Sequence, residues 1–203
     1  MFELGRNTGK MHKWLQAVRL PDKPAWQPDK AGYLDEWQKN WNKTGEAGDK
    51  VVLEWLGRSR KLVESLDFRM FDASPVGWLH WDLWVDNILV NGRGLSGIVD
   101  FDRMAAAYPE IDVARAILSG SLADGKLRTD TVKSFVAGYR EHLELPPGTL
   151  VRAFIMLYLN ESIWWLRTEI REESRLRGLL GRFVEEMHWI EDNWGTLREQ
   201  LHF

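Results

Sequence analysis

The sequence predicts an α+β protein that is predominantly α-helical and contains one small β-hairpin. Apolar residues recur every three or four positions through most of the 203 residues, as in amphipathic helices. Residues 88–101 depart from this pattern, because two short apolar runs flank Asn91-Gly92, a favoured pair for a tight hairpin turn. A helical body interrupted by one hairpin is therefore expected.

Three helices are expected before residue 80. Apolar residues have helical spacing in residues 3–20, and prolines make residues 21–30 a loop. A short helix follows at residues 31–42, and Asp49 is a suitable N-cap for a third helix. The side chains expected to face inward are Met11, Trp14, Leu15, Val18, Leu34, Trp37, Trp41, Val52, Trp55, Leu56, Leu62, Val63 and Leu66.

Helices are again expected after Pro109. Thr129 or Asp130 is expected to cap one of them, and Thr149 is expected to cap a longer one. The expected ranges are 111–118, 130 to Pro146, 149 to about 171, and 175–193. The chain would then consist of a helical entry region at 1–79, a loop region at 80–102 and a helical region at 103–203.

The composition excludes several classes of protein. A net charge of −3 gives no basic field for nucleic acid, and the absence of cysteine excludes disulfides and thiolate metal sites. No apolar run approaches the roughly 20 residues of a membrane span, and residues 1–6 do not have the apolar region of a signal peptide. We therefore expect a cytoplasmic protein without membrane or nucleic-acid partners.

Three polar residues around the predicted hairpin have the order of a phosphoryl-transfer site. Asp82 lies five residues before Asn87, and Asp100 follows thirteen residues later at the end of an apolar run. Asp82 is suited to orient a substrate hydroxyl and accept its proton, while Asn87 and Asp100 can bind Mg²⁺ on a nucleotide. The hairpin should bring Asn87 and Asp100 side by side. A surface loop with ordinary acids is the alternative.

Three neighbouring residues are assigned supporting roles. The His80 ring can hydrogen-bond to the backbone near Asp100 and brace the loop. Asp112, near a helix start, can accept backbone N–H bonds from the loop. Asp102 could be a further metal or water ligand, or a capping acid, and the second role is slightly favoured.

Three other patterns suggest different ligands. Residues 92–99 match G-x-G-x-x-G-x-V, but they lie between Asn87 and Asp100 and are better explained as a hairpin turn. Residues 5–11 resemble a phosphate-binding loop, yet the glycine spacing is one residue short and the segment is expected to be helical. A zinc site on His80 and Asp82 lacks further nitrogen or sulfur ligands nearby.

The motifs resemble those of the aminoglycoside phosphotransferase and choline kinase family, whose fold is protein-kinase-like. The matching residues are His80-x-Asp82-Leu83-x-x-x-Asn87-Ile88-Leu89, then Ile98-Val99-Asp100-Phe101, then Asp112-Val113-Ala114. Residues 4–12 also look like the helix by which that family enters its helical lobe. The resemblance implies a kinase C-terminal lobe that uses ATP or GTP and Mg²⁺ to phosphorylate a hydroxyl of a small molecule.

Carried over by residue, the resemblance implies Asp82 as catalytic base and Asn87 and Asp100 as magnesium and nucleotide ligands. Trp81 replaces the usual glycine, and Trp84 replaces the usual histidine. Both changes concern the acceptor more than the chemistry. In the family the helices after the metal-binding acid build the acceptor site. The residues of this chain that correspond to those helices are Glu161, Trp164 and Trp165, and Trp84 is the fourth candidate for binding the acceptor. Their aromatic rings and one charge suit a cationic or sugar-like acceptor.

The sequence shows no strand carrying the family's N-lobe lysine, so the N-lobe is expected to be absent from this chain. The surface that normally meets that lobe should be apolar, and we expect a homodimer or a separate N-lobe partner. Two alternative functions are a pseudokinase-like binding module and a metal-dependent hydrolase that uses the same acids without ATP.

Overall fold

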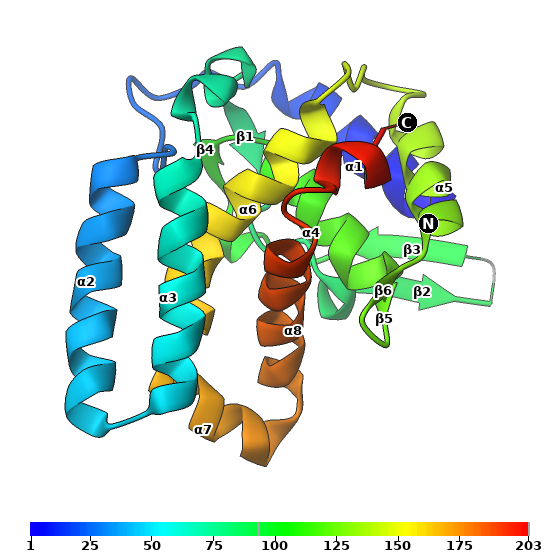
Figure 1. Ribbon diagram of the computed structural model, residues 1–203. Coiled ribbons are helices and arrows are strands. Elements are labelled where there is room, and N and C mark those ends of the chain that lie inside the picture. The colour runs from blue at the N-terminus through cyan, green and yellow to red at the C-terminus, as the bar shows by residue number, and fades with distance from the viewer. Residues whose placement is uncertain (93, 203) are drawn as a thin grey trace. The chain divides into compact units, whose positions relative to one another are not determined.

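The computed structural model describes residues 1–92 and 94–202, with the backbone only at residues 174–177 and 179 (Figure 1). The described chain divides into two compact units that interleave along the sequence. Unit 1 comprises Met1–Gln27, Ala73–Phe154 and Arg198–Phe203. Unit 2 comprises Pro28–Asp72 and Ile155–Leu197. The predicted α+β, predominantly helical architecture is confirmed.

Unit 1 contains three complete helices and all the strands of the described residues. It also contains parts of two further helices, α6 and α9. Its helices are α1 (Phe2–Leu15), α4 (Glu110–Ser121) and α5 (Thr129–Tyr139), with the start of α6 (Thr149–Trp165) and α9 (Leu197–Gln200). Its strands are β1 (Gly77–Leu79), β2 (Ile88–Asn91), β3 (Gly94–Ile98), β4 (Ala105–Ala107), β5 (Leu122–Ala123) and β6 (Lys126–Leu127). Short 3₁₀ turns are η2 (Val85–Asn87) and η3 (Phe101–Arg103), and η1 (Phe68–Ala73) ends at the border of unit 2.

The predicted hairpin is present as the antiparallel pair β2–β3, although β3 ends at Ile98 rather than Phe101. Gly94 has φ 119°, which supports the turn interpretation of the glycine-rich segment, while residue 93 of that turn lies outside the described residues. The expectation of a single hairpin was wrong, because β1–β4 and β5–β6 also pair antiparallel. These strands have only two or three residues each, too few for an alternating pattern to be recognised.

The inward face predicted for α1 was also wrong. Trp14 and Val18 are 67% and 46% exposed, whereas the buried residues are Leu4, Gly5, Thr8, Gly9 and His12. The reason is a close helix crossing with α5. A Cβ atom added at Gly5 would lie 2.0 Å from the Phe135 carbonyl oxygen, and one added at Gly138 would lie 2.1 Å from that of Phe2. The glycines of the apparent phosphate-binding loop therefore serve helix packing.

Unit 2 consists of helices in the described residues. They are α2 (Lys30–Ala47), α3 (Lys50–Ser65), the later part of α6, α7 (Thr168–Arg177) and α8 (Leu179–Asp192). Asp49 caps α3 as predicted, since its carboxylate accepts a hydrogen bond from the Val52 N–H at 3.3 Å. Trp37 of α2 donates its indole N–H to the Leu56 carbonyl of α3 at 2.8 Å. The two helices visible as neighbours in Figure 1 are thus joined by a buried hydrogen bond.

Several helix boundaries differ from those predicted. Helix α1 ends at Leu15 instead of residue 20, α2 continues to Ala47 instead of ending at residue 42, and α5 ends at Tyr139 instead of near Pro146. The long helix expected to continue to about residue 171 ends at Trp165, and α7 begins separately at Thr168. No glycine or proline marks this break, so no sequence signal announces it. Neither Thr129 nor Asp130 caps α5, because Arg128 holds the N-cap position, and Thr149 is the first residue of α6 rather than its cap.

A buried ion pair joins α4 to the start of α6 within unit 1. Arg152 donates from Nη2 to Glu110 Oε1 at 2.9 Å and from Nε to the Ser74 hydroxyl at 3.0 Å. Burial raises the pKa of Glu110 above its ordinary value of 4.5, and the hydrogen bond and charge of Arg152 oppose this rise. The free-energy cost of removing the Glu110 carboxylate from water therefore cancels part of the stability that its ion pair with Arg152 contributes.

Replacing Gly5 with alanine is expected to destabilise the protein by about 1–3 kcal/mol, because the new methyl group would overlap backbone of α5. The matched control is Gly57→Ala in α3, where an added Cβ meets nothing within 4 Å. The control should be neutral or raise stability by about 0.5–1 kcal/mol, since alanine favours a helix. Urea unfolding of both variants measures the difference, and an equally stable Gly5→Ala protein would contradict the close crossing.

The raised pKa of Glu110 predicts a specific pH dependence. A carboxyl group with a higher pKa in the folded than in the unfolded state binds its proton more tightly when folded. Its contribution to stability therefore falls as pH rises from about the unfolded value through the folded one. Relative to Glu110→Gln, the natural protein should lose free energy of unfolding as pH increases above 4.5. Urea unfolding from pH 4 to 7 tests this, and a gain in relative stability with rising pH would refute it.

Candidate active site

The hairpin brings Asn87 and Asp100 to the same place, as its length predicts. Ile88 pairs with Ile98, and the Val99 N–H donates to the Asn87 carbonyl oxygen at 3.0 Å. Asn87 therefore stands opposite Val99, and Asp100 follows directly. Figure 1 shows this pair of strands as a separate two-stranded ribbon of unit 1.

The Asn87 side chain is tied to the backbone of Asp82. Its amide Nδ2 donates to the Asp82 carbonyl oxygen at 2.7 Å, and the residue is only 7% exposed. Because the nitrogen is engaged, the amide oxygen is the atom left for another ligand. The candidate metal ligand and the candidate base are thereby held in one hydrogen-bonded turn.

Asp82 is half-buried and lies two residues after His80. Its backbone N–H donates to His80 Nδ1 at 3.3 Å. Within residues 1–92 and 94–202, the Asp82 carboxylate has no hydrogen-bond or ion-pair partner. A carboxylate held by its backbone and left open at its oxygens can accept a proton from a bound hydroxyl.

His80 makes the bracing hydrogen bond that the sequence predicts. Its fully buried ring donates from Nε2 to the Val99 carbonyl oxygen at 2.9 Å, next to Asp100. Nδ1 accepts the Asp82 N–H, so both ring nitrogens are engaged and the orientation of the ring is fixed. The ring also contacts Phe101 edge to face, with centroids 4.6 Å apart. A zinc site on His80 and Asp82 is incompatible with these bonds.

Asp112 anchors the loop from α4, also as predicted. Its carboxylate accepts the backbone N–H of His80 at 2.6 Å and that of Trp81 at 2.8 Å. Asp112 is fully buried, so these hydrogen bonds stabilise a charge that has lost its water.

His12 of α1 completes the anchor and was missed by the sequence analysis. Its Nε2 lies 3.0 Å from Asp112 Oδ2, and its Nδ1 lies 2.9 Å from the Tyr139 hydroxyl of α5. All three side chains are buried. The sequence did contain a signal that could have indicated His12. Gly5, Thr8, Gly9 and His12 recur every three or four residues, so they share the helix face that packs against α5.

Two residues at the site have left-handed backbone conformations. Trp81 has φ 67°, and Asp100 has φ 62° and ψ 63°. Non-glycine residues rarely adopt this region, and strain there costs about 1–3 kcal/mol. The glycine that the family usually has at position 81 would adopt it freely. The hydrogen bond from the Trp81 N–H to Asp112 helps to hold the strained loop.

The remaining predicted site residues fall into different places. Asp102 lies within η3, is exposed, and makes no capping hydrogen bond among the described residues. Trp84 is half-buried in unit 1, next to η2. Glu161, Trp164 and Trp165 belong to unit 2.

The three residues of unit 2 do not share one environment. Trp165 donates its indole N–H to Glu161 Oε2 at 2.8 Å and stacks on Phe183, with centroids 4.4 Å apart. Trp164 is 58% exposed. One of the adjacent tryptophans is thus packed and the other is accessible.

The positions of Asn87 and Asp100 suit magnesium better than a metal ion that takes all its ligands from the protein. Among the described residues, no three His, Asp or Glu side chains are arranged to hold a metal ion. Magnesium usually takes one or two protein oxygens and completes its shell with water and substrate phosphates. An amide oxygen and an exposed carboxylate at neighbouring backbone positions meet that requirement.

The chain is similar to a family of phosphotransferases. The family model described as "Phosphotransferase enzyme family" matches residues 1–154. Homoserine kinase of Sinorhizobium medicae is 24% identical over 174 residues, covering 82% of this chain and 52% of that protein. Homoserine kinase of Mesorhizobium japonicum is 28% identical over 166 residues, covering 78% of this chain and 50% of that protein. The chain thus spans about half the length of these curated relatives.

Two solved structures show the same fold. The gentamicin complex of APH(2")-IIa has a TM-score of 0.57 at 13% identity and covers all of this chain and 64% of the other. Choline kinase of Cryptosporidium parvum has a TM-score of 0.56 at 13% identity and covers 98% of this chain and 67% of the other. The match over residues 1–154 spans well over half of the sequence, and the chain therefore belongs to the phosphotransferase enzyme family.

Proposed function

We propose that this chain is the catalytic and substrate-binding lobe of a small-molecule kinase, corresponding to the C-terminal lobe of a protein-kinase-like fold. The reaction would transfer the γ-phosphoryl group of ATP or GTP to a hydroxyl group. The observation that supports this most directly is the hydrogen bond between the Asn87 amide and the Asp82 carbonyl, at the end of the hairpin that leads to Asp100. Base and ligand positions are thus set by one local structure.

The proposed mechanism assigns each residue one task. The Asp82 carboxylate would orient the acceptor hydroxyl in line with the γ-phosphorus and accept its proton as the new oxygen–phosphorus bond forms. The Asn87 amide oxygen and the Asp100 carboxylate would hold magnesium, which when bound neutralises charge on the phosphate oxygens. His80 would keep Asp100 and Asp82 in register through its two ring nitrogens.

A hollow beside the hairpin suits the nucleotide. It has a volume of about 470 Å³ and lies between the outer face of α1 and β3. Phe101, directly after Asp100, forms part of its lining, and so does Lys10. A nucleotide in this hollow would have its phosphates near Asp100, with Lys10 available to an anion.

Exposed apolar side chains at the hollow and on the neighbouring strand β2 favour a binding partner. Trp14, Val90 and Phe101 are 67%, 73% and 42% exposed in unit 1. Since exposed apolar clusters tend to mark interaction sites, we propose that a second copy of the chain, or a separate chain carrying an N-terminal lobe, covers them. We also propose a cytoplasmic location, where ATP is available, and cell fractionation tests it. None of the described helices is long and apolar enough to cross a membrane.

For the acceptor we propose a small hydroxyl compound that also carries an amine. The names of the relatives and of the solved structures make homoserine, choline and aminoglycosides the first compounds to test. The exposed Trp164 and the Glu161 carboxylate supply an aromatic ring and a negative charge for such a cation, which would share the Trp164 ring with the Arg167 guanidinium 5.9 Å away or displace it. Trp84 and Trp165 complete the proposed set.

Magnesium-dependent nucleotide binding is the first prediction to test. Calorimetric titration of the chain with Mg-ATP and Mg-GTP should show saturable binding that is lost with EDTA. Asp100→Asn should weaken binding at least about tenfold, because it removes a charged ligand. The matched control is Asp102→Asn in the same exposed turn, which should bind like the natural chain.

The same samples distinguish the alternatives. Asp82→Asn should keep nucleotide binding and lower phosphoryl transfer by about 10²–10⁴-fold, as expected for loss of a general base. Binding without turnover in the natural full-length protein would instead support a pseudokinase-like module. A purely monomeric sedimentation profile, with no partner chain recovered, would count against the proposed association. Equal binding by the Asp100 and Asp102 variants would refute the proposed metal ligands.

Glu161→Gln is expected to weaken the binding of homoserine or choline by about tenfold, since it removes a charge while keeping an acceptor for the Trp165 indole. Glu46→Gln in α2, at an exposed position, is the control and should have no effect. Calorimetry in the presence of Mg-ATP measures both affinities. Unchanged binding in the Glu161 variant would remove Glu161 from the proposed acceptor site.

A further inference from the structure

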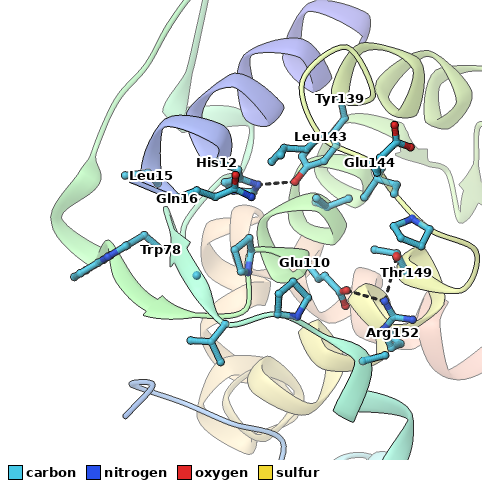
Figure 2. Close-up of a pocket in the computed structure, with 18 of the residues that line it drawn as sticks. His12, Leu15, Gln16, Trp78, Glu110, Tyr139, Leu143, Glu144, Thr149 and Arg152 are labelled. Carbon is cyan, nitrogen blue, oxygen red and sulfur yellow. Dashed lines mark hydrogen bonds and ion pairs between the residues drawn. The ribbon is translucent and has the colours of Figure 1, made fainter. Parts of the chain in front are cut away.

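A second cavity lies in unit 1, and none of the candidate catalytic residues lines it. Its volume is about 630 Å³, within the range typical of small-molecule sites. Figure 2 shows side chains from α1, β1, α4, α5 and the start of α6 around it. Asp82, Asn87 and Asp100 are not among the lining residues. The cavity is therefore distinct from the proposed phosphotransfer site.

Most of the cavity wall is apolar. The indole of Trp78 is held in the wall by a hydrogen bond to the Arg19 carbonyl oxygen at 3.2 Å. Further apolar lining residues are Leu15, Val76, Leu143, Leu145 and Pro146. Walls of this kind exclude water from an apolar guest and so favour its binding.

One of the lining residues, Arg152, has an unused hydrogen-bond donor. Arg152 donates hydrogen bonds from Nε to the Ser74 hydroxyl, and from Nη2 to the Glu110 carboxylate and the Thr149 hydroxyl. Its Nη1 has no hydrogen-bond partner within the part of the chain that the structure describes. Figure 2 shows the guanidinium between Glu110 and Thr149, which together with Arg152 form a polar group at one side of the cavity. Two N–H donors thus remain for an acceptor atom.

The charges of the wall favour a neutral guest. Glu110 and Arg152 form an ion pair, so neither contributes a full charge to the cavity. The other lining carboxylate, Glu144, is exposed, so solvent screens its charge. An uncharged carbonyl or hydroxyl oxygen can accept a hydrogen bond from Nη1 without needing a charged partner in the wall.

Another part of the cavity wall is connected by hydrogen bonds to the loop that contains Asp82. His12 and Tyr139 line the cavity and are joined by a hydrogen bond drawn in Figure 2. The other nitrogen of His12 contacts Asp112, whose carboxylate holds the backbone N–H groups of His80 and Trp81. Two successive hydrogen bonds therefore connect the cavity wall with the residue before Asp82.

We propose that this cavity binds a small, neutral, mainly apolar molecule with one hydrogen-bond acceptor, and that its occupancy stabilises the catalytic loop through His12 and Asp112. The guest would pack against Trp78 and Leu143 and place its acceptor at Arg152. By ordering the His12–Tyr139 wall, it would reduce opening of the hydrogen bonds at His80 and Trp81. Any effect of the bound molecule on phosphoryl transfer rests on the function proposed above. The existence of the binding site does not depend on that function.

Benzophenone is a suitable probe, because it is a neutral diaryl ketone and attaches to nearby C–H groups on irradiation. Saturable labelling is expected on peptides that contain Leu15, Val76 or Leu143, as read by mass spectrometry. Leu143→Trp fills the cavity and should reduce labelling about tenfold, a loss of about 1.4 kcal/mol. Val76→Trp is a second filling variant at a loop position that is 38% exposed and tolerant of change.

The donor at Arg152 is tested by Arg152→Met combined with Glu110→Gln, which removes both charges together. Affinity for benzophenone in the dark should fall about fivefold, as for the loss of one hydrogen bond. Amide exchange at His80 and Trp81, followed by nuclear magnetic resonance, should slow when benzophenone is bound and should not change in Leu143→Trp.

Labelling that does not saturate, or that is equal in folded filling variants, would overturn the site. Saturable labelling with unchanged exchange at His80 and Trp81 would overturn the link to the loop. Neither readout uses nucleotide or turnover. A failure here leaves the proposed phosphotransfer intact, and a failure to bind Mg-ATP leaves this site intact.

Discussion

The carboxylate of Asp112 is the group on which the candidate site depends most. It is fully buried and accepts hydrogen bonds from two successive backbone N–H groups, while His12 approaches the same oxygen that binds His80. A buried charge is stable only when its lost hydration is replaced by such donors. In return, the carboxylate fixes the backbone directly before Asp82. Helix α4, helix α1 and the loop therefore meet at one side chain.

This anchor explains how the loop tolerates a strained residue. Trp81 has a left-handed backbone that glycine would adopt at little cost. Its N–H is bound by Asp112, and a chain released from that bond would relax toward the ordinary region. Asp100 is held in a similar conformation between the end of β3 and η3. Left-handed backbone thus occurs directly before Asp82 and at Asp100, so the strain lies at the two carboxylates of the candidate site.

Local motifs made the centre of the site predictable. The hairpin signal, the acid and amide spacing, and the helix-start position of Asp112 each act over a few residues. The hairpin and the Asp112 anchor are present in the structure, although Asn91 is the last residue of β2 and pairs with Gly94 instead of lying in the turn. The α1 face was missed because hydrophobicity patterns overlook glycine, and Gly5 and Gly138 are buried through backbone approach instead. His12 was missed with them. The pair β1–β4 joins segments far apart in sequence, and only the folded chain defines its register.

Asn87 shows why the site residues cannot be regarded as independent. Its amide nitrogen holds the Asp82 carbonyl, and its backbone carbonyl accepts the Val99 N–H that leads into Asp100. His80 closes the same circuit from the other side, through Asp82 and Val99. A change at either residue would move the proposed base and a proposed ligand together, so their effects on the proposed function should not add. The closed set of hydrogen bonds is therefore one structural unit, and the three polar side chains at its rim are the ones to which we assign the proposed chemistry.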